Sequence, residues 1–226
     1  MPPFGAANFM VTEARKAALV KKYPTEMVYV IPYDSLKRIQ DKFTPEKDGD
    51  WVKRIQYRWW DKAGKFIFRY DAEENPVFQQ IIPYILVCNK EKNRFFVTKR
   101  IAGEERLKGS LALGCGGHIN PCDAESEKII FNAALRELNE ELNAPDTITK
   151  EDFDVIGTVR SITSTTNDHL GVVMTIAIDE DQVSVKEIDN LEGVWMDLSE
   201  LVANYEKFES WARFIIDYFY TENKKS

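Results

Sequence analysis

The chain has 226 residues, of which 44% are hydrophobic and 30% charged, a composition typical of a globular domain with an extension. Its net charge of −7 repels phosphate polymers, which argues against a nucleic-acid-binding protein, whereas a small phosphorylated substrate is compatible once a bound metal supplies positive charge. No stretch approaches the roughly 18 to 20 apolar residues of a membrane span, and the N-terminus lacks a signal-peptide apolar run, so we expect a cytoplasmic protein without a membrane partner.

The first 75 residues predict a small accessory unit of helix and strand. The expected elements are, in chain order, a helix over 14–22, a strand over 27–33, a short helix over 36–41, a loop over 43–51, and a hairpin formed by 54–60 and 65–70. The polar segment 71–76 ends in proline and marks a boundary. We therefore predict a β-rich extension over 1–75 and a main domain over 76–226.

The main domain predicts strands on either side of a central helix. The expected strands cover 81–88, 94–99, 153–162, 171–178 and 192–197, and the expected helices cover 126–142, 198–205 and 208–220. This order predicts a layered α/β fold. The last helix carries an apolar stripe at helical spacing, which indicates packing in the core or in a homodimer; its residues are Trp211, Phe214, Ile215, Tyr218 and Phe219.

Three glutamates in the central predicted helix carry the first chemical signal. Glu137, Glu140 and Glu141 are three and four residues apart, so one helix face gathers all three carboxylates. Two like charges about 4 Å apart repel by roughly 4 kcal/mol at an effective dielectric near 20, and in a cleft a cation relieves that repulsion. Carboxylate oxygens are hard ligands, which predicts a site for Mg²⁺ or Mn²⁺.

The context of these glutamates resembles the Nudix box, the signature of Nudix (MutT-like) diphosphate hydrolases, G-x₅-E-x₇-R-E-U-x-E-E-x-G-U with U aliphatic. Arg136 to Glu141 match R-E-U-x-E-E in full, and Gly117, preceded by Gly116, matches the glycine. The resemblance implies an α/β/α sandwich with a mixed central sheet, here with an N-terminal α+β extension. It also implies a metal-dependent hydrolase that cleaves a diphosphate linkage.

The resemblance further implies which residues form the site. The glutamates Glu137, Glu140 and Glu141 and the backbone of Gly116 would hold the metal, with Glu137 also counted among the catalytic residues. Arg136 would orient a carboxylate, and Gly117 would contact the substrate.

Two departures from the family pattern leave one position open. Twelve residues, instead of seven, separate Asp123 from Arg136, and Asp123 itself stands where the family has glutamate. Asp123, Glu125 or Glu127 would then replace the missing partner of Arg136. Asn143 replaces the closing glycine, a mild change because asparagine tolerates the left-handed conformation that ends helices.

The expected reaction is attack of water on phosphorus in a nucleoside-diphosphate-X type substrate, and it needs a base to accept the water proton. In related enzymes that base is a box glutamate or an acid in a late loop. In the loop 186–192 we favour Glu187, followed by Asp189 and Glu192. The candidates for contact with the substrate are Arg100, Arg106, Lys108 and His118.

Two other functions compete with hydrolysis. An enzyme like isopentenyl diphosphate isomerase would use a cysteine beside a glycine–histidine pair, and Cys115-Gly-Gly-His118 resembles this pair faintly. That family also needs a histidine-rich metal site, which a chain with two histidines cannot readily provide. The three cysteines fit no zinc-binding spacing and are expected to be reduced thiols. A non-catalytic Nudix-fold module that binds or senses nucleotides is the second alternative, which the three intact glutamates disfavour.

Overall fold

The computed structural model describes residues 12–36, 42–46, 64–102, 108–125, 128–161 and 168–225. Its helices are α1 (Glu13–Lys22), α3 (Arg69–Ala72), α4 (Ile129–Glu141), α5 (Leu198–Ala203) and α6 (Ser210–Asn223). Short 3₁₀ turns add η1 (Tyr33–Leu36), η4 (Pro121–Glu125), η5 (Lys150–Asp152), η6 (Glu180–Gln182) and η7 (Tyr205–Lys207). Within these ranges no helix is long and apolar enough to cross a membrane.

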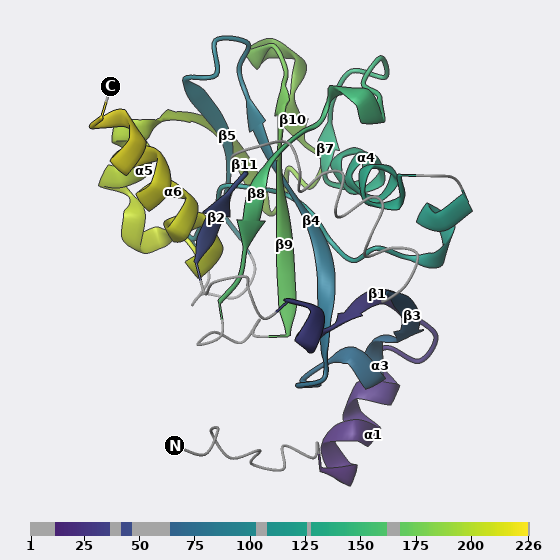
Figure 1. Ribbon diagram of the computed structural model, residues 1–226. Helices are drawn as coiled ribbons and strands as arrows, with labels where there is room; N and C mark the ends of the chain where they lie inside the picture. The colour runs from purple at the N-terminus through teal and green to yellow at the C-terminus, as the bar shows by residue number, and fades with distance from the viewer. Residues whose placement is uncertain are drawn as a thin grey trace, which may run out of the picture.

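One mixed sheet forms the centre of the molecule (Figure 1). Its strands are β1 (Met27–Pro32), β2 (Phe43–Pro45), β3 (Lys65–Phe68), β4 (Phe78–Cys88), β5 (Arg94–Arg100), β6 (Leu111–Ala112), β8 (Asp154–Val159), β9 (His169–Ala177) and β11 (Leu191–Asp197). The main order is β11-β5-β4-β9-β8-β2, and the central pair β4–β9 is parallel while the other pairs are antiparallel. A separate small ladder joins β7 (Leu142–Asn143) to β10 (Ser184–Val185).

Helices cover both faces of this sheet, with α4 on one face and α5 and α6 on the other (Figure 1). Helix α4 buries Ile130, Ala134 and Leu138, which recur every four residues and so line one side of the helix. Helix α6 buries Trp211 and Ile215 in the opposite layer. The expected α/β/α sandwich with a mixed sheet is confirmed, and the α6 stripe packs in the core.

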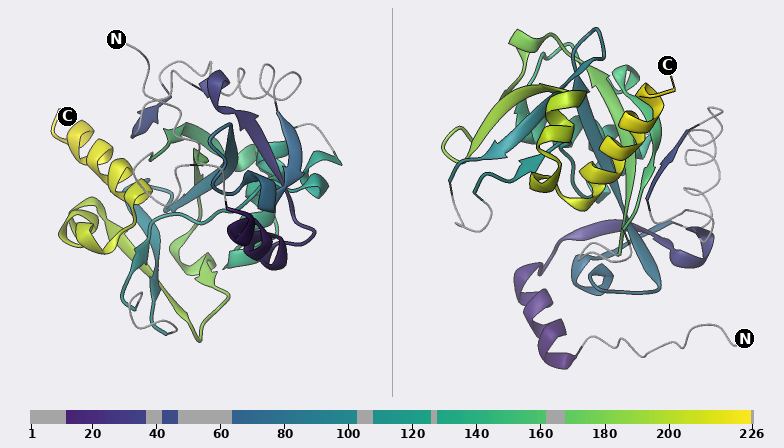
Figure 2. Two further views of the ribbon diagram at one scale, coloured as in Figure 1. Left: turned by 90° about the horizontal axis from the view of Figure 1, so that it is seen from below. Right: turned by 90° about the vertical axis from the view of Figure 1, so that its left-hand side faces the viewer.

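The N-terminal residues are built into the same sheet. Strand β1 pairs with β3 on one side and with the beginning of β4 on the other, where Val30 lies opposite Gln80. Figure 2 shows α1, α3, β1 and β3 gathered at one end of the molecule. Whether residue 75 divides two separable units stays a prediction.

Three expectations for this region are wrong or fall partly outside the described residues. Residues 43–45 were expected in a loop but form β2, because Phe43 is buried against Tyr218 and the strand pairs with β8 at the edge of the sheet. Strand β3 pairs with β1, and its expected partner 54–60 lies outside the described residues. Of the helix expected over 36–41, only residue 36 is described, at the end of η1.

Candidate active site

The glycine-rich loop lies against the central strand β4. Cys115 bridges to Ile85, with two backbone hydrogen bonds of 2.8 and 3.0 Å between them. Gly116 has a φ of +154°, and a Cβ at this position would lie 1.9 Å from the carbonyl oxygen of Pro83. A Cβ at Gly117 would lie 2.5 Å from the carboxylate of Glu137. Glycine at both positions thus lets the loop fit between β4 and helix α4.

Arg136 joins the loop to the carboxylates of α4. Its Nη1 donates to Glu137 at 2.7 Å and to Glu140 at 3.1 Å. Its Nη2 donates to the carbonyl oxygen of His118 at 2.8 Å. One guanidinium therefore fixes two of the predicted metal ligands relative to the glycine loop.

The remaining donors of Arg136 bind Asp123 in a bidentate pair, with Nε and Nη2 at 3.0 and 2.9 Å from the two carboxylate oxygens. Asp123 is buried, with 4% of its side chain exposed, and also accepts from the backbone N–H of Asn120 at 2.8 Å. Of the other two acids considered as the partner, Glu125 is exposed and Glu127 lies outside the described residues. Asp123 is therefore the acid that binds Arg136 in place of the family glutamate.

Glu141 is the fourth acid of the site, and its pKa is raised by its surroundings. Its carboxylate accepts the backbone N–H of Gly116 at 3.2 Å. Partial burial, together with Glu137, Glu187 and Glu140 nearby, raises the pKa of Glu141 to about 7, against the lowering effect of the Gly116 hydrogen bond. Burial also raises the pKa of Glu137, although Arg136 opposes this.

This donor set fits a divalent cation. Three carboxylates (Asp123, Glu137 and Glu140) bind the Arg136 guanidinium, and Glu141 lies close to two of them, which gives these five groups a net charge of −3 if all the acids ionise. Raised carboxylate pKa values report mutual repulsion in a partly desolvated place, which a bound cation would relieve.

The late loop carrying Glu187 is attached to the end of α4. The backbone N–H of Lys186 donates to the carbonyl oxygen of Glu141 at 3.1 Å, and the Lys186 ammonium donates to the carbonyl oxygen of Asn139. Glu187 is exposed and close enough to raise the pKa of Glu141. No sequence pattern marks Lys186 as a site residue, because its contacts form only when the fold brings the loop to the end of α4.

The other predicted residues belong to strands β5 and β11 and to the loops next to them. Glu192 pairs with Lys99 at 3.3 Å, and Asp189 is exposed in the same loop. Arg100 ends β5 and hydrogen-bonds through its backbone to Ser110 and Gly109. Lys108 is described and exposed, while Arg106 falls outside the described residues.

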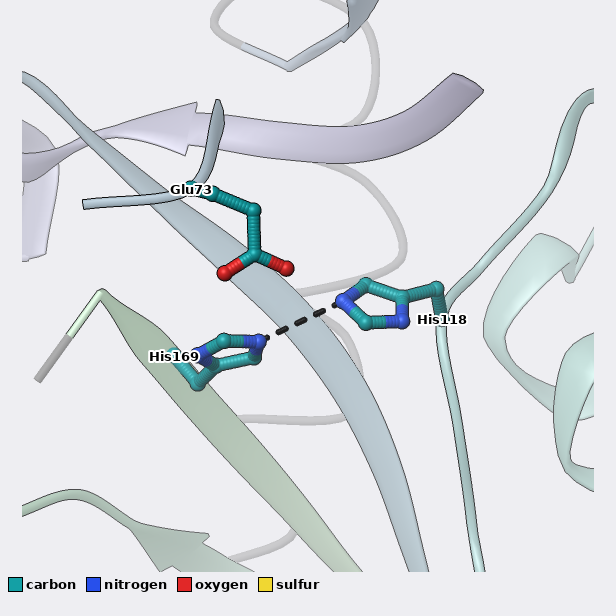
Figure 3. Close-up of side chains that lie close together, drawn as sticks. All are labelled: Glu73, His118 and His169. Carbon is teal, nitrogen blue, oxygen red and sulfur yellow. Dashed lines mark hydrogen bonds between the residues drawn. The ribbon is translucent and has the colours of Figure 1, made fainter. Parts of the chain in front are cut away.

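The ring of His118 faces a cluster that sequence reasoning missed. Its Nε2 lies 3.3 Å from Nε2 of His169, and Glu73 lies beside both rings (Figure 3). These residues are 45 and 51 positions apart in the chain and belong to no motif, so only the fold brings them together.

Cys115 does not have the surroundings of a nucleophile. Its side chain is 6% exposed, and burial raises the pKa of its thiol well above the usual range. A thiolate is the reactive form of cysteine, so this environment argues against the isomerase-like alternative.

The comparisons with known proteins agree with this geometry. The family model described as NUDIX domain matches residues 80–219. Protein YmaB of Bacillus subtilis (strain 168) is 36% identical over 160 residues, which cover 66% of this chain and 75% of that protein. The crystal structure of Tm1382, a protein assigned to the Nudix hydrolases, superposes with a TM-score of 0.68 at 25% identity and covers 86% of this chain and 98% of that one. The expected family and enzyme class are confirmed: the chain belongs to the NUDIX family and is a Nudix hydrolase.

Proposed function

We propose that the protein hydrolyses a diphosphate linkage in a nucleoside-diphosphate-X type substrate, with Mg²⁺ or Mn²⁺ at the glutamates of α4. One observation carries this proposal: three glutamates of α4 lie together beside the glycine loop. Arg136 binds the carboxylates of Glu137 and Glu140, and Glu141 accepts the backbone N–H of Gly116. The same residues and the backbone of Gly116 are the proposed metal ligands. The acidic surroundings suit a substrate whose phosphates arrive with a metal ion rather than a bare anion.

The reaction balances as a hydrolysis. The oxygen of water forms a bond to phosphorus, the bond from that phosphorus to the bridging oxygen breaks, and the bridging oxygen leaves with the other phosphate. The α4 glutamates would hold a divalent ion, which when bound would neutralise phosphate charge and lower the pKa of the attacking water. Glu187 accepts the water proton in this proposal, because its loop is hydrogen-bonded to the end of α4 beside Glu141.

Arg136 acts as a positioning residue in this scheme, because its donors are occupied by Asp123, Glu137, Glu140 and the carbonyl oxygen of His118. We assign Gly117 to substrate contact because a residue without a side chain leaves its backbone accessible beside the carboxylate of Glu137. Arg100 stays a candidate for contact with the outer phosphate. A cytoplasmic location and a homodimer stay predictions.

The test measures release of phosphate or nucleoside monophosphate from a panel of diphosphate compounds with Mg²⁺ and with Mn²⁺. Glu140→Gln should lower turnover at least about a hundredfold, because a metal supplies several kcal/mol of transition-state stabilisation. Glu187→Gln should lower it by about 10²- to 10⁴-fold, the range for loss of a general base.

Glu91→Gln is the matched control, since Glu91 is an exposed glutamate in the turn between β4 and β5. Activity of Glu140→Gln within about threefold of the parent would remove this residue from the metal site. Nucleotide binding without turnover, for every metal and substrate tried, would favour the non-catalytic module. An unchanged stability of each variant, within about 0.5 kcal/mol, shows that the fold is intact.

A further inference from the structure

A second group of metal-ligating side chains lies outside the glutamates of α4. Glu73 follows α3, His118 follows the glycine loop, and His169 begins β9 (Figure 3). Each offers one ligand atom, and these atoms all lie within 4.8 Å of one another. All three side chains are partly buried, so they are shielded from bulk solvent without being closed off from it.

The spacing of the two histidines matches a metal-bound pair. Two bonds of about 2.0–2.1 Å from a tetrahedral zinc ion place the two nitrogens about 3.3 Å apart. The Nε2 atoms of His118 and His169 are 3.3 Å apart, with the ring planes inclined at 62° and the two nitrogens facing one another (Figure 3). A carboxylate oxygen of Glu73 lies within 4.8 Å of a ring nitrogen of each histidine.

Asp168 orients the ring of His169 in a way that suits a metal ligand. Its Nδ1 lies 2.7 Å from Asp168, which is 5% exposed and also accepts the backbone N–H of Glu74 and the side-chain amide of Gln80. A carboxylate at one ring nitrogen holds the proton there and leaves the lone pair of the other nitrogen for a metal.

The backbone holds His118 in place for a metal. Its carbonyl oxygen accepts a hydrogen bond from Nη2 of Arg136 at 2.8 Å, which anchors the residue beside the glycine loop. When a metal binds at Nε2, the single proton of the imidazole ring occupies Nδ1, so that Nε2 presents its lone pair to the ion.

The local charge also accommodates a dication. Arg69 donates Nε to Glu73 at 2.8 Å and Nη1 to Glu26 at 3.0 Å. Together with Asp168, which hydrogen-bonds His169, these groups comprise three carboxylates and one guanidinium, a net charge of −2 before any metal binds. A dication brings this sum to zero, so the nearby arginine does not exclude it.

We propose that Glu73, His118 and His169 form a second metal site, for a zinc-type transition metal ion, in addition to the hydrolytic site at α4. Two imidazoles and one carboxylate select transition metals of this class over Mg²⁺, which prefers oxygen ligands alone. Three protein ligands leave the fourth tetrahedral position for water or a substrate oxygen. The site joins the N-terminal residues to the glycine loop and to β9.

The first experiment measures binding of Zn²⁺ to the tag-free, chelator-treated full chain in saturating Mg²⁺, which occupies the α4 glutamates. We expect one Zn²⁺ per chain. His118→Gln and His169→Gln should each weaken binding more than about a hundredfold, beyond the 10- to 100-fold ascribed to loss of an orienting partner. Glu73→Gln should also weaken it, whereas Glu74→Gln, at the neighbouring exposed position, should not. Absence of a stoichiometric site, or unchanged affinity in both histidine variants, overturns the proposal.

A second measurement uses the parent protein, so it tests the site even if the histidine variants do not fold. The chain contains two histidines, so nitrogen-15 labelling of histidine gives ring signals from this cluster alone. Zn²⁺ should shift the Nε2 resonances of both rings, and a titration that moves neither refutes the site. Glu140→Gln separates the two sites, because it should abolish Mg²⁺-dependent hydrolysis while leaving zinc binding intact.

Discussion

At the scale of single residues, Arg136 and Asp123 show what the sequence can and cannot predict. The motif identifies Arg136 and the glutamates, because their spacing is fixed by the helix that carries them. It does not identify the acid that binds Arg136, because that acid comes from η4, across a segment whose path the sequence does not reveal. Among the described residues, Asp123 is singled out over Glu125 by its burial and by the hydrogen bond from Asn120, and neither can be read from the sequence.

The Asp123–Arg136 pair predicts a large effect of a small change. Asp123→Asn keeps the shape but removes the charge that balances a partly buried guanidinium. We expect a loss of about 3 kcal/mol in the free energy of unfolding, the lower end for a broken buried ion pair. Chemical denaturation measures it.

Glu125→Gln is the control for this variant, since Glu125 is an exposed acid in the same 3₁₀ turn. It should change stability by less than about 0.5 kcal/mol. Equal effects of the two substitutions would show that Asp123 contributes nothing particular through Arg136.

The pKa of Glu141 predicts how stability depends on pH without metal. It rises from 4.5 to about 7 on folding, so the folded protein binds more protons than the unfolded chain between these values. Stability therefore falls as pH increases through this window. Thermal unfolding in chelator at about pH 5 and pH 7 should show the fall, and Glu141→Gln should reduce it. A slope that is the same in parent and variant contradicts the assignment, and Glu91→Gln should keep the parent slope.

At the scale of elements, strongly periodic segments were predicted well and short edge elements were not. Helices α4 and α6 carry apolar residues every three or four positions, which is a local signal that one side packs on a sheet. Strand β2 has only three residues. It forms because it pairs with β8 and because the ring of Phe43 packs against Tyr218. No property of residues 43–45 alone reveals that partner.

Two glycines with positive φ allow backbone strain to be separated from steric collision in the glycine loop. Gly116 and Gly109 both have positive φ, but a Cβ would meet the Pro83 carbonyl at Gly116 and nothing within 4 Å at Gly109. Gly109→Ala should therefore cost only backbone strain, about 1–2 kcal/mol. Gly116→Ala adds a collision with the sheet and should cost at least about 3 kcal/mol.

Chemical denaturation of both variants measures this difference. A loss at Gly116 no larger than that at Gly109 would mean that the loop moves away from β4 at little cost. The glycine would then be required for its φ alone.

At the scale of the whole molecule, residues far apart in the chain share one core. Leu36 and Ile31, from the N-terminal region, are each 1% exposed in the same cluster as Ile130 and Leu138 of α4. The backbone N–H of Tyr29 donates to the carbonyl oxygen of Ile119, next to His118. The sequence could predict the N-terminal strands but not this junction, since contacts between distant segments leave no periodic trace.

This shared core predicts one cooperative unfolding transition. Leu36→Ala should lower the free energy of unfolding by about 2–5 kcal/mol and shift the whole transition. Val20→Ala in α1, where the side chain is 38% exposed, should change it by less than about 0.5 kcal/mol. Calorimetry that shows two transitions, with Leu36→Ala moving only one, would establish an independent N-terminal domain.

The route from Asp123 to α4 bears on how relatives of this protein are recognised. Lys128, with a φ of +67°, immediately precedes α4, and Arg136 on that helix binds Asp123 across twelve intervening residues. Loop closure costs only about 0.6 kcal/mol for each doubling of length, so such insertions are tolerated between partners that meet in space. A search pattern that allows aspartate and a variable gap before R-E-x-x-E-E should therefore retrieve homologues that a fixed-spacing signature rejects.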